Sequence, residues 1–151
     1  MKKQNKSRNV LMALLLLTVV LIWGQSVLPV PMSNSESKAV TEQIVKPVET
    51  AVTGKTSATN NVVRKYAHAI EFLVLGVEMM LLCGTKGKPS YAAFSYCGAI
   101  AFLDETIQIF SGRGPMIKDV WIDLLGAAGG ILAVCLIRLL TGCRGKKTDK
   151  D

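Results

Sequence analysis

The sequence predicts an all-α protein: a multi-pass membrane helical bundle with four transmembrane helices. Four apolar segments recur along the chain, each about 20 residues long and able to cross a bilayer at roughly 1.5 Å per residue. Two of the connections between them are short, which is typical of antiparallel neighbouring helices. The chain has 151 residues, is 50% hydrophobic and carries a net charge of +7. Lys and Arg flank the apolar runs, as they do at cytoplasmic membrane boundaries.

The first apolar segment covers residues 10–30, contains no charged residue and follows a basic N-terminus at 1–9. This pattern also fits a signal peptide, with Gly24-Gln25-Ser26 as the candidate cleavage site. Apolar residues and Pro continue beyond that site, which favours a retained transmembrane helix.

The second part of the chain, at 31–61, is predicted to be a flexible outer loop. It is rich in Ser, Thr, Glu, Lys and Asn and lacks the apolar periodicity of a folded domain. A core with three further transmembrane helices follows at 62–140, and the helices are expected at 62–83, 91–110 and 119–140. A basic tail at 141–151 ends the chain.

The distribution of basic residues predicts that both termini are cytoplasmic. With the N-terminus inside, 11 Lys and Arg residues fall on the inner side and 7 on the outer side. The four cysteines then lie at inner helix ends or in inner halves, so no disulfide is expected. They lack the C-x-x-C spacing of a metal site. The basic residues also form no helical stripe with interleaved aromatics, which argues against a nucleic-acid partner.

Ionisable residues inside the apolar segments indicate a polar site. A charged group at the bilayer centre costs about 2.5–3.5 kcal/mol even on lenient insertion scales, so such residues usually line a site. With antiparallel helices, the polar residues of three segments fall near the outer ends. They are Arg64, His68 and Glu71; Asp104, Glu105 and Gln108; and Asp119 and Asp123, with Arg113 in the preceding loop. His68, Glu71, Asp104, Glu105 and Asp123 are expected roughly 5–10 Å below the interface.

The spacing of these residues predicts that they share helix faces. Asp104 and Gln108 are four residues apart, as are Asp119 and Asp123. The face of Asp119 and Asp123 continues as Gly126 and Gly130, and small residues four apart let helices approach closely in a membrane. The acidic face of the last helix should therefore point into the bundle.

Simpler interpretations exist for several residues. Lys65 and Lys118 fit a role as interface markers that extend toward lipid phosphates. A lone histidine such as His68 is often a packing residue, and Glu78 lies deeper and apart. The adjacent pair Asp104 and Glu105 is harder to explain, because two neighbouring carboxylates face different sides of a helix and at least one needs a cation or a proton. Arg113 is the obvious cationic partner, since the turn Ser111-Gly112-Arg113-Gly114-Pro115 could aim it at the site.

The combined pattern resembles the VanZ-like family over most of the chain. The similarity rests on Arg64-Lys65-x-x-His68-x-x-Glu71-Phe72, Asp104-Glu105-x-x-Gln108, Arg113 followed by Asp119, and Asp123-x-x-Gly126, with Gln25-Ser26 at the end of the first span. The resemblance implies a small multi-pass bacterial membrane protein linked to teicoplanin resistance. The first outer loop is longer than expected for the family, and Phe72 stands where Tyr is common.

The first functional hypothesis is an envelope factor that binds or modifies an anionic lipid-linked substrate, such as a cell-wall precursor, at the outer face of the cell membrane. The substrate-binding residues would be Arg64, Gln108, Arg113 and Asp119, and the catalytic residues His68, Glu71, Asp104, Glu105 and Asp123. Histidine and carboxylates also suit a divalent cation, although the sequence selects no ligand set.

Three alternatives remain open at the level of sequence. The same groups fit a non-catalytic module that binds lipid or a partner protein. An ion-coupled transporter would use Glu78 as a deep proton relay, but no inverted repeat supports it. A purely structural network would hold the helices together without further function. The oligomeric state is not predicted.

Overall fold

The computed structural model describes residues 2–27, 42–43, 60–111 and 117–145, with side chains placed for 6–27, 42–43, 65–111 and 118–141. These residues form four long helices: α1 (Lys2–Val27), α4 (Asn60–Thr85), α5 (Ser90–Phe110) and α6 (Ile117–Gly145). The predicted all-α fold is confirmed. The helices begin or end beyond several of the predicted spans, because hydropathy marks only the apolar part of a helix and polar flanks can continue it.

Three helices of the described part are long and apolar enough to cross a membrane, over Lys6–Val27, Lys65–Thr85 and Lys118–Thr141. These segments belong to α1, α4 and α6. The helix α5 is not among them because Asp104, Glu105 and Gln108 lower the hydropathy of its second half. Membrane crossing by α5 therefore stays a prediction.

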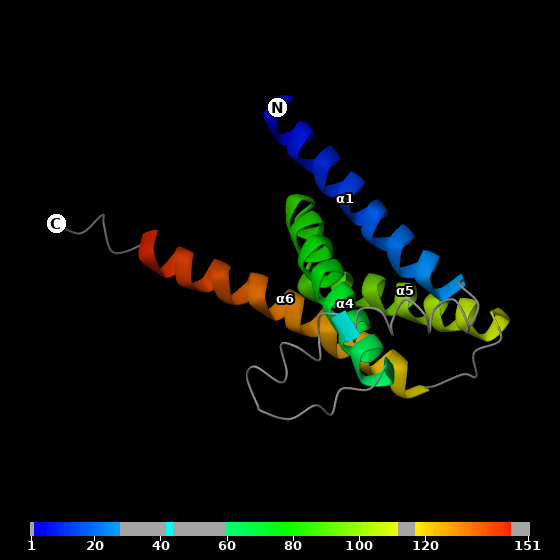
Figure 1. The fold of residues 1–151 in the computed structure, drawn as a ribbon. Helices are drawn as coiled ribbons and strands as arrows, with labels where there is room; N and C mark the ends of the chain where they lie inside the picture. The colour runs from blue at the N-terminus through cyan, green and yellow to red at the C-terminus, as the bar shows by residue number, and fades with distance from the viewer. Residues whose placement is uncertain (1, 28–41, 44–59, 112–116, 146–151) are drawn as a thin grey trace.

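The four helices converge at one end and spread apart at the other (Figure 1). The C-terminal ends of α1 and α5 lie close to the N-terminal ends of α4 and α6, whereas the chain termini point away from this end. The most extensive contact joins α4 to α6, and α4 also packs against α1 and α5. The convergent end therefore brings polar residues of different helices together.

Glycines explain the closeness of α4 and α6. A Cβ added at Gly126 would clash with the backbone carbonyl of Ala69, and one added at Gly130 would clash with that of Leu73. Gly76 of α4 meets the carbonyl of Ala127 in the same way. The predicted close approach at Gly126 and Gly130 is confirmed, and it turns the face carrying Asp123 into the bundle.

A glycine turn ends α4 and starts α5. Gly87 has a φ of 64°, in the left-handed region that glycine adopts at little cost. The amide of Lys88 donates to the carbonyl of Cys83, and the amide of Gly87 donates to that of Gly84, which is the Schellman pattern of a helix end. Pro89 then adopts an extended conformation, and α5 begins at Ser90. The result is the predicted tight hairpin.

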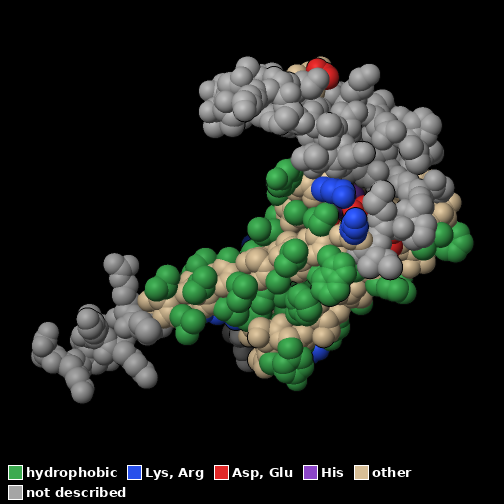
Figure 2. Space-filling view, turned by 90° about the horizontal axis from the view of Figure 1, so that it is seen from below, with side chains coloured by type: hydrophobic (Ala, Val, Ile, Leu, Met, Phe, Trp, Pro, Cys, Tyr) green, Lys and Arg blue, Asp and Glu red, His purple; other side chains and the backbone are tan. Residues whose placement is uncertain are grey.

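The core is narrow, and much apolar surface faces outward. Phe72, Leu75 and Ile22 are fully buried, together with small residues such as Cys97 and Ala101. Large apolar side chains elsewhere on the helices are exposed, and Figure 2 shows them covering much of one face. Contiguous exposed apolar surface on this scale is typical of a membrane contact.

Some predictions fall on residues outside the described ranges. The predicted loop at 31–61 and the tail at 141–151 lie largely there, and so does Arg113. Arg64 belongs to α4, but its side chain is also outside the described part.

Candidate functional site

The convergent end carries a cluster of buried and half-buried polar side chains, which we call the polar cluster. Its buried members are Ser26, His68, Asp104, Gln108 and Asp123, and Glu71 is half-buried. They come from all four helices. Asp104 is fully buried, Asp123 is 3% exposed and His68 is 9% exposed. Polar groups buried this deeply require partners, because an unsatisfied one costs about 1–3 kcal/mol and a charge costs more.

Asp104 is positioned by its own helix and by α1. Nε2 of Gln108 donates to Oδ2 of Asp104 at 2.7 Å and lies 3.4 Å from Oγ of Ser26. The four-residue spacing places Gln108 one helical turn after Asp104, as predicted. The other carboxylate oxygen of Asp104, Oδ1, is buried and accepts no hydrogen bond from the described residues.

His68 and Glu71 lie one turn apart on α4. Nδ1 of His68 and Oε2 of Glu71 are 3.8 Å apart, which is longer than a hydrogen bond. The two groups form an ion pair only if the imidazole is protonated. Oε1 of Glu71 instead accepts a 2.7 Å hydrogen bond from Nε2 of Gln25 on α1. Glu71 is therefore held mainly by α1, beside the imidazole rather than bonded to it.

Asp123 faces the same interior from α6. Its Oδ1 atom is buried and accepts no hydrogen bond within the described part of the chain. A nitrogen of His68, an oxygen of Asp104 and an oxygen of Asp123 lie within 4.8 Å of one another. Three helices thus bring together one imidazole and two carboxylates, a donor set that could hold a metal ion.

An ion pair lies beside the polar cluster on α4 and α6. Nζ of Lys65 is 3.6 Å from Oδ1 of Asp119, and both side chains are partly exposed. Lys65 lies about one helical turn before His68 on α4, and Asp119 lies about one turn before Asp123 on α6. Figure 2 shows Lys or Arg, acidic and histidine atoms next to one another on this face. The Lys65–Asp119 pair therefore marks the rim of the polar cluster.

Two further acidic residues, Glu105 and Glu78, are not part of the group of three ligand atoms. Glu105 is half-buried and adjoins Asp104 on a neighbouring helix face, as expected for consecutive residues. Glu78 lies farther along α4, where its Oε1 accepts a 3.2 Å hydrogen bond from Oγ1 of Thr18 on α1. Glu78 thus has a partner on α1 that its sequence position did not indicate.

The first helix, α1, contributes more to the polar cluster than the sequence predicts. Gln25 and Ser26 carry only a family resemblance in the sequence, yet both hydrogen-bond to residues of the polar cluster, and Thr18 hydrogen-bonds to Glu78. All three are hydrogen-bonding side chains in an otherwise apolar segment. That is the signal that could have identified them, because a polar residue in a membrane helix usually faces another helix.

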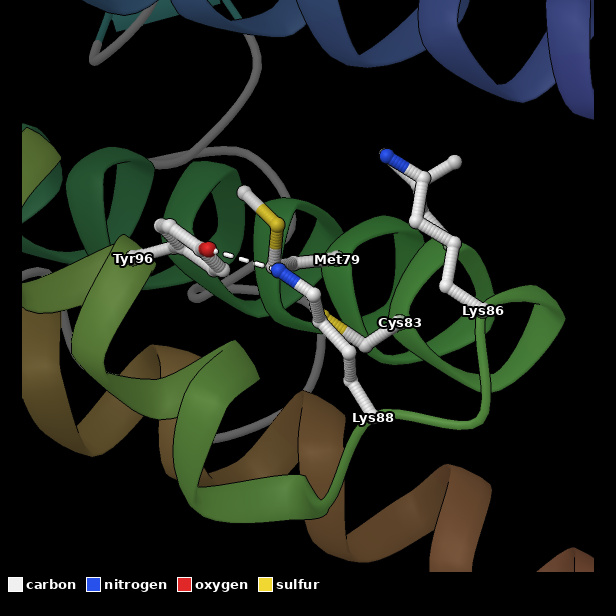
Figure 3. Close-up of a pocket in the computed structure, with 6 residues that line it drawn as sticks. Met79, Cys83, Lys86, Lys88 and Tyr96 are labelled. Carbon is white, nitrogen blue, oxygen red and sulfur yellow. Dashed lines mark hydrogen bonds between the residues drawn. The ribbon is translucent and has the colours of Figure 1, made fainter.

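A pocket of about 200 Å³ lies at the opposite end of α4 from the polar cluster (Figure 3). It is lined by Met79, Leu82, Cys83, Lys86, Lys88 and Tyr96. Nζ of Lys88 donates to the hydroxyl of Tyr96 at 2.9 Å, and this hydrogen bond raises the pKa of the Lys88 ammonium. Its polar groups are basic and phenolic, so this pocket is chemically distinct from the polar cluster.

The fold and the polar cluster define a class: a small helical membrane protein with a buried ionisable site where its helices converge. The VanZ/LLP1 family model matches residues 10–138, most of the chain. The chain belongs to the VanZ/LLP1 family. No curated protein and no solved structure matches it.

Proposed function

We propose that this VanZ-family protein is a multi-pass protein of the bacterial cell membrane that binds an anionic lipid-linked substrate, such as a cell-wall precursor, at the outer face. Both termini would be cytoplasmic, which puts the polar cluster near the outer surface. The basic residues at the other end, including Lys86 and Lys88 beyond α4, support this orientation.

The observation that carries the proposal is an apolar groove next to the polar cluster. The groove has a volume of about 270 Å³ and is lined by Lys65, Tyr66, Ala69 and Ile122. Ala69 and Ile122 each adjoin a polar-cluster residue in sequence, His68 and Asp123 respectively. An apolar groove with a cation at its side suits a molecule that has both a lipid chain and an anionic group.

Lys65 is the described residue best placed to contact the anion. The Lys65 side chain is 42% exposed and that of its partner Asp119 is 24% exposed. Nζ of Lys65 is 3.6 Å from Oδ1 of Asp119, and partly exposed ion pairs of this kind are weak. A phosphate could therefore replace the Asp119 carboxylate as the partner of the Lys65 ammonium. Arg64 and Arg113 would provide further phosphate or carboxylate contacts, as we infer from the sequence.

Altering or sequestering such a precursor at the cell surface would change sensitivity to antibiotics that recognise it. We therefore propose a contribution to glycopeptide resistance of the teicoplanin type, which the family resemblance implies. The site residues His68, Glu71, Asp104, Glu105 and Asp123 would act on the bound substrate if the protein is an enzyme.

The test is complementation of teicoplanin resistance in a bacterial host, with protein levels measured in the membrane fraction. Single alanine variants at His68, Glu71, Asp104 and Arg113 should reduce resistance to that of the empty vector. Lys88→Ala, at the opposite end of α4, is the matched control and should retain resistance. Full resistance in the four site variants at unchanged expression would overturn the proposal.

A second experiment separates an enzyme from a binding module. Purified protein in lipid nanodiscs is incubated with lipid-linked cell-wall precursors, and both binding and product formation are followed. Product that disappears in His68→Ala indicates an enzyme, whereas saturable binding without turnover indicates a module. Absence of both would exclude these precursors as the substrate.

A further inference from the structure

We propose that His68, Asp104 and Asp123 form a binding site for one divalent transition-metal ion, with Zn²⁺ preferred. The three residues come from α4, α5 and α6, and their ligand atoms lie within 4.8 Å of one another. This assignment needs no lipid-linked substrate, so it stands independently of the function proposed above.

The spacing is close to that of a metal site. Ligand atoms about 2.1 Å from a tetrahedral Zn²⁺ are about 3.4 Å from one another. The three atoms here are within 4.8 Å, so modest rotations of the side chains would bring them to bonding distance. Three protein ligands leave a fourth position for water or a substrate oxygen, as in catalytic zinc sites.

Two unsatisfied oxygens point to a ligand. Oδ1 of Asp104 and Oδ1 of Asp123 are both buried and accept no hydrogen bond from the described residues. Both side chains are more than nine-tenths buried, and each offers an oxygen to the same group of three. A buried carboxylate oxygen without a donor is costly, and a metal ion would satisfy both oxygens at once.

The surroundings orient the proposed ligands. Gln108 donates to Oδ2 of Asp104 at 2.7 Å, so the hydrogen bond holds one oxygen and leaves Oδ1 available. Glu71 lies 3.8 Å from Nδ1 of His68 and is itself held by Gln25. Metal-ligating histidines and carboxylates commonly have polar outer partners of this kind, which fix ring and carboxylate orientation.

Charge also favours a cation. Asp104 and Asp123 each offer an oxygen to the same group of ligand atoms within 4.8 Å, so two ionised carboxylates would repel each other there. The described cation nearest in sequence to His68, Lys65, is paired with Asp119 at the rim. A divalent ion between Asp104 and Asp123 would balance both charges in a region of low dielectric constant.

The donor set predicts the order of affinity. One imidazole and two carboxylates suit Zn²⁺ and, more weakly, Mn²⁺, following the general order for nitrogen and oxygen sites. Mg²⁺ and Ca²⁺ prefer oxygen ligands throughout and a larger number of them. Zn²⁺ should therefore bind more tightly than Mn²⁺, and both more tightly than Mg²⁺ or Ca²⁺.

The experiment measures metal binding to the full chain in detergent, purified through a tag without histidine. Bound metal is removed with a chelator, and Zn²⁺, Mn²⁺, Mg²⁺ and Ca²⁺ are titrated separately by calorimetry. Co²⁺ replaces Zn²⁺ as a spectroscopic probe of the ligand field. We expect saturable binding of one Zn²⁺ per chain and a Co²⁺ spectrum typical of low coordination number.

Isosteric variants locate the site. Asp104→Asn and Asp123→Asn should each weaken Zn²⁺ binding by at least about 100-fold, because loss of a direct ligand exceeds the 10–100-fold effect of losing an outer partner. The matched control is Glu78→Gln, which removes a partly buried carboxylate on α4 outside the group of three. It should bind Zn²⁺ like the unmodified chain.

Three outcomes would overturn the proposal: no saturable Zn²⁺ binding by the unmodified chain, unchanged binding in both Asn variants, or tighter binding of Mg²⁺ or Ca²⁺ than of Zn²⁺. The first and third outcomes do not depend on the folding of any variant. If an Asn variant does not fold, His68→Gln and the Co²⁺ spectrum provide the second measurement. If the unmodified chain binds Zn²⁺ but does not bind the lipid-linked precursors, the proposed function is rejected and the metal site is not.

Discussion

Gln108 holds the buried carboxylate of Asp104 from one helical turn away on α5, donating to Oδ2 at 2.7 Å. The same amide nitrogen lies 3.4 Å from the Ser26 hydroxyl of α1, so it connects two helices at the centre of the polar cluster. Since Asp104 is fully buried, this amide is a principal source of stabilisation for the carboxylate among the described residues.

Replacing Gln108 with Leu should destabilise the protein by about 1–3 kcal/mol, because the fully buried Asp104 loses a hydrogen-bond donor. Reversible unfolding in mixed micelles measures the free-energy change. The control on the same helix is Ser95→Ala, which removes an exposed hydroxyl that donates to the carbonyl of Tyr91. Equal stability of the two variants would show that the Gln108 amide does not support Asp104.

Gly130→Ala should destabilise the contact between α4 and α6. Its new Cβ would clash with the backbone carbonyl of Leu73, and overpacking of this kind typically costs about 1–3 kcal/mol. The unfolding midpoint in detergent measures the change. A midpoint at or above that of the unmodified protein would contradict the close approach of the two helices.

The neighbouring glycine provides the matched control. A Cβ at Gly129 would lie 3.9 Å from Cδ1 of Leu73, an ordinary van der Waals contact. Gly129→Ala should therefore be neutral or stabilising by up to about 1 kcal/mol, since alanine favours the helix. The opposite signs expected at adjacent positions exclude a general effect of the added methyl group.

The hydrogen bond between Thr18 and Glu78 should contribute modestly to the packing of α1 on α4. Its 3.2 Å length and membrane setting predict a coupling energy of about 0.6 kcal/mol in a double-mutant cycle of Thr18→Val and Glu78→Met. Unfolding of the four proteins of the cycle measures the coupling. Additive effects would mean that the two side chains do not interact.

The predicted orientation can be tested by thiol labelling of intact cells. All four natural cysteines are replaced by alanine, and single cysteines are introduced by Ser35→Cys and Ser7→Cys. A membrane-impermeant maleimide should label position 35 before lysis and position 7 only after lysis, because the basic N-terminus is expected in the cytoplasm. Labelling in the reverse order would mean that the polar cluster lies near the cytoplasmic face.

Several features of the site were predictable from local sequence. Asp104 and Gln108 share a face because four residues make about one helical turn. Asp123 shares a face with Gly126, three residues on, for the same reason. The short connection at Gly87 indicated a hairpin, which sets α5 beside α4. These inferences needed only helical periodicity, chain length and turn chemistry.

The partners across helices were not predictable in this way. Arg113 was expected to pair with a carboxylate of the polar cluster, and it lies outside the described residues. The described partner of Asp104 is the neutral amide of Gln108, and that of Glu71 is the amide of Gln25, 46 positions away. Lys65, interpreted as an interface residue, pairs with Asp119.

The sequence by itself determined four helical segments, their apolar character and the positions of the ionisable residues along each helix, because each depends on local composition and a fixed rise per residue. Only the tertiary structure decided that α1 supplies Gln25 and Ser26, and that His68, Asp104 and Asp123 come within 4.8 Å. Those contacts depend on how closely the helices approach and how they rotate, which is decided by packing at residues such as Gly126 and Gly130. The ionisable residues that hydropathy alone would disfavour thus meet at one buried place in the fold.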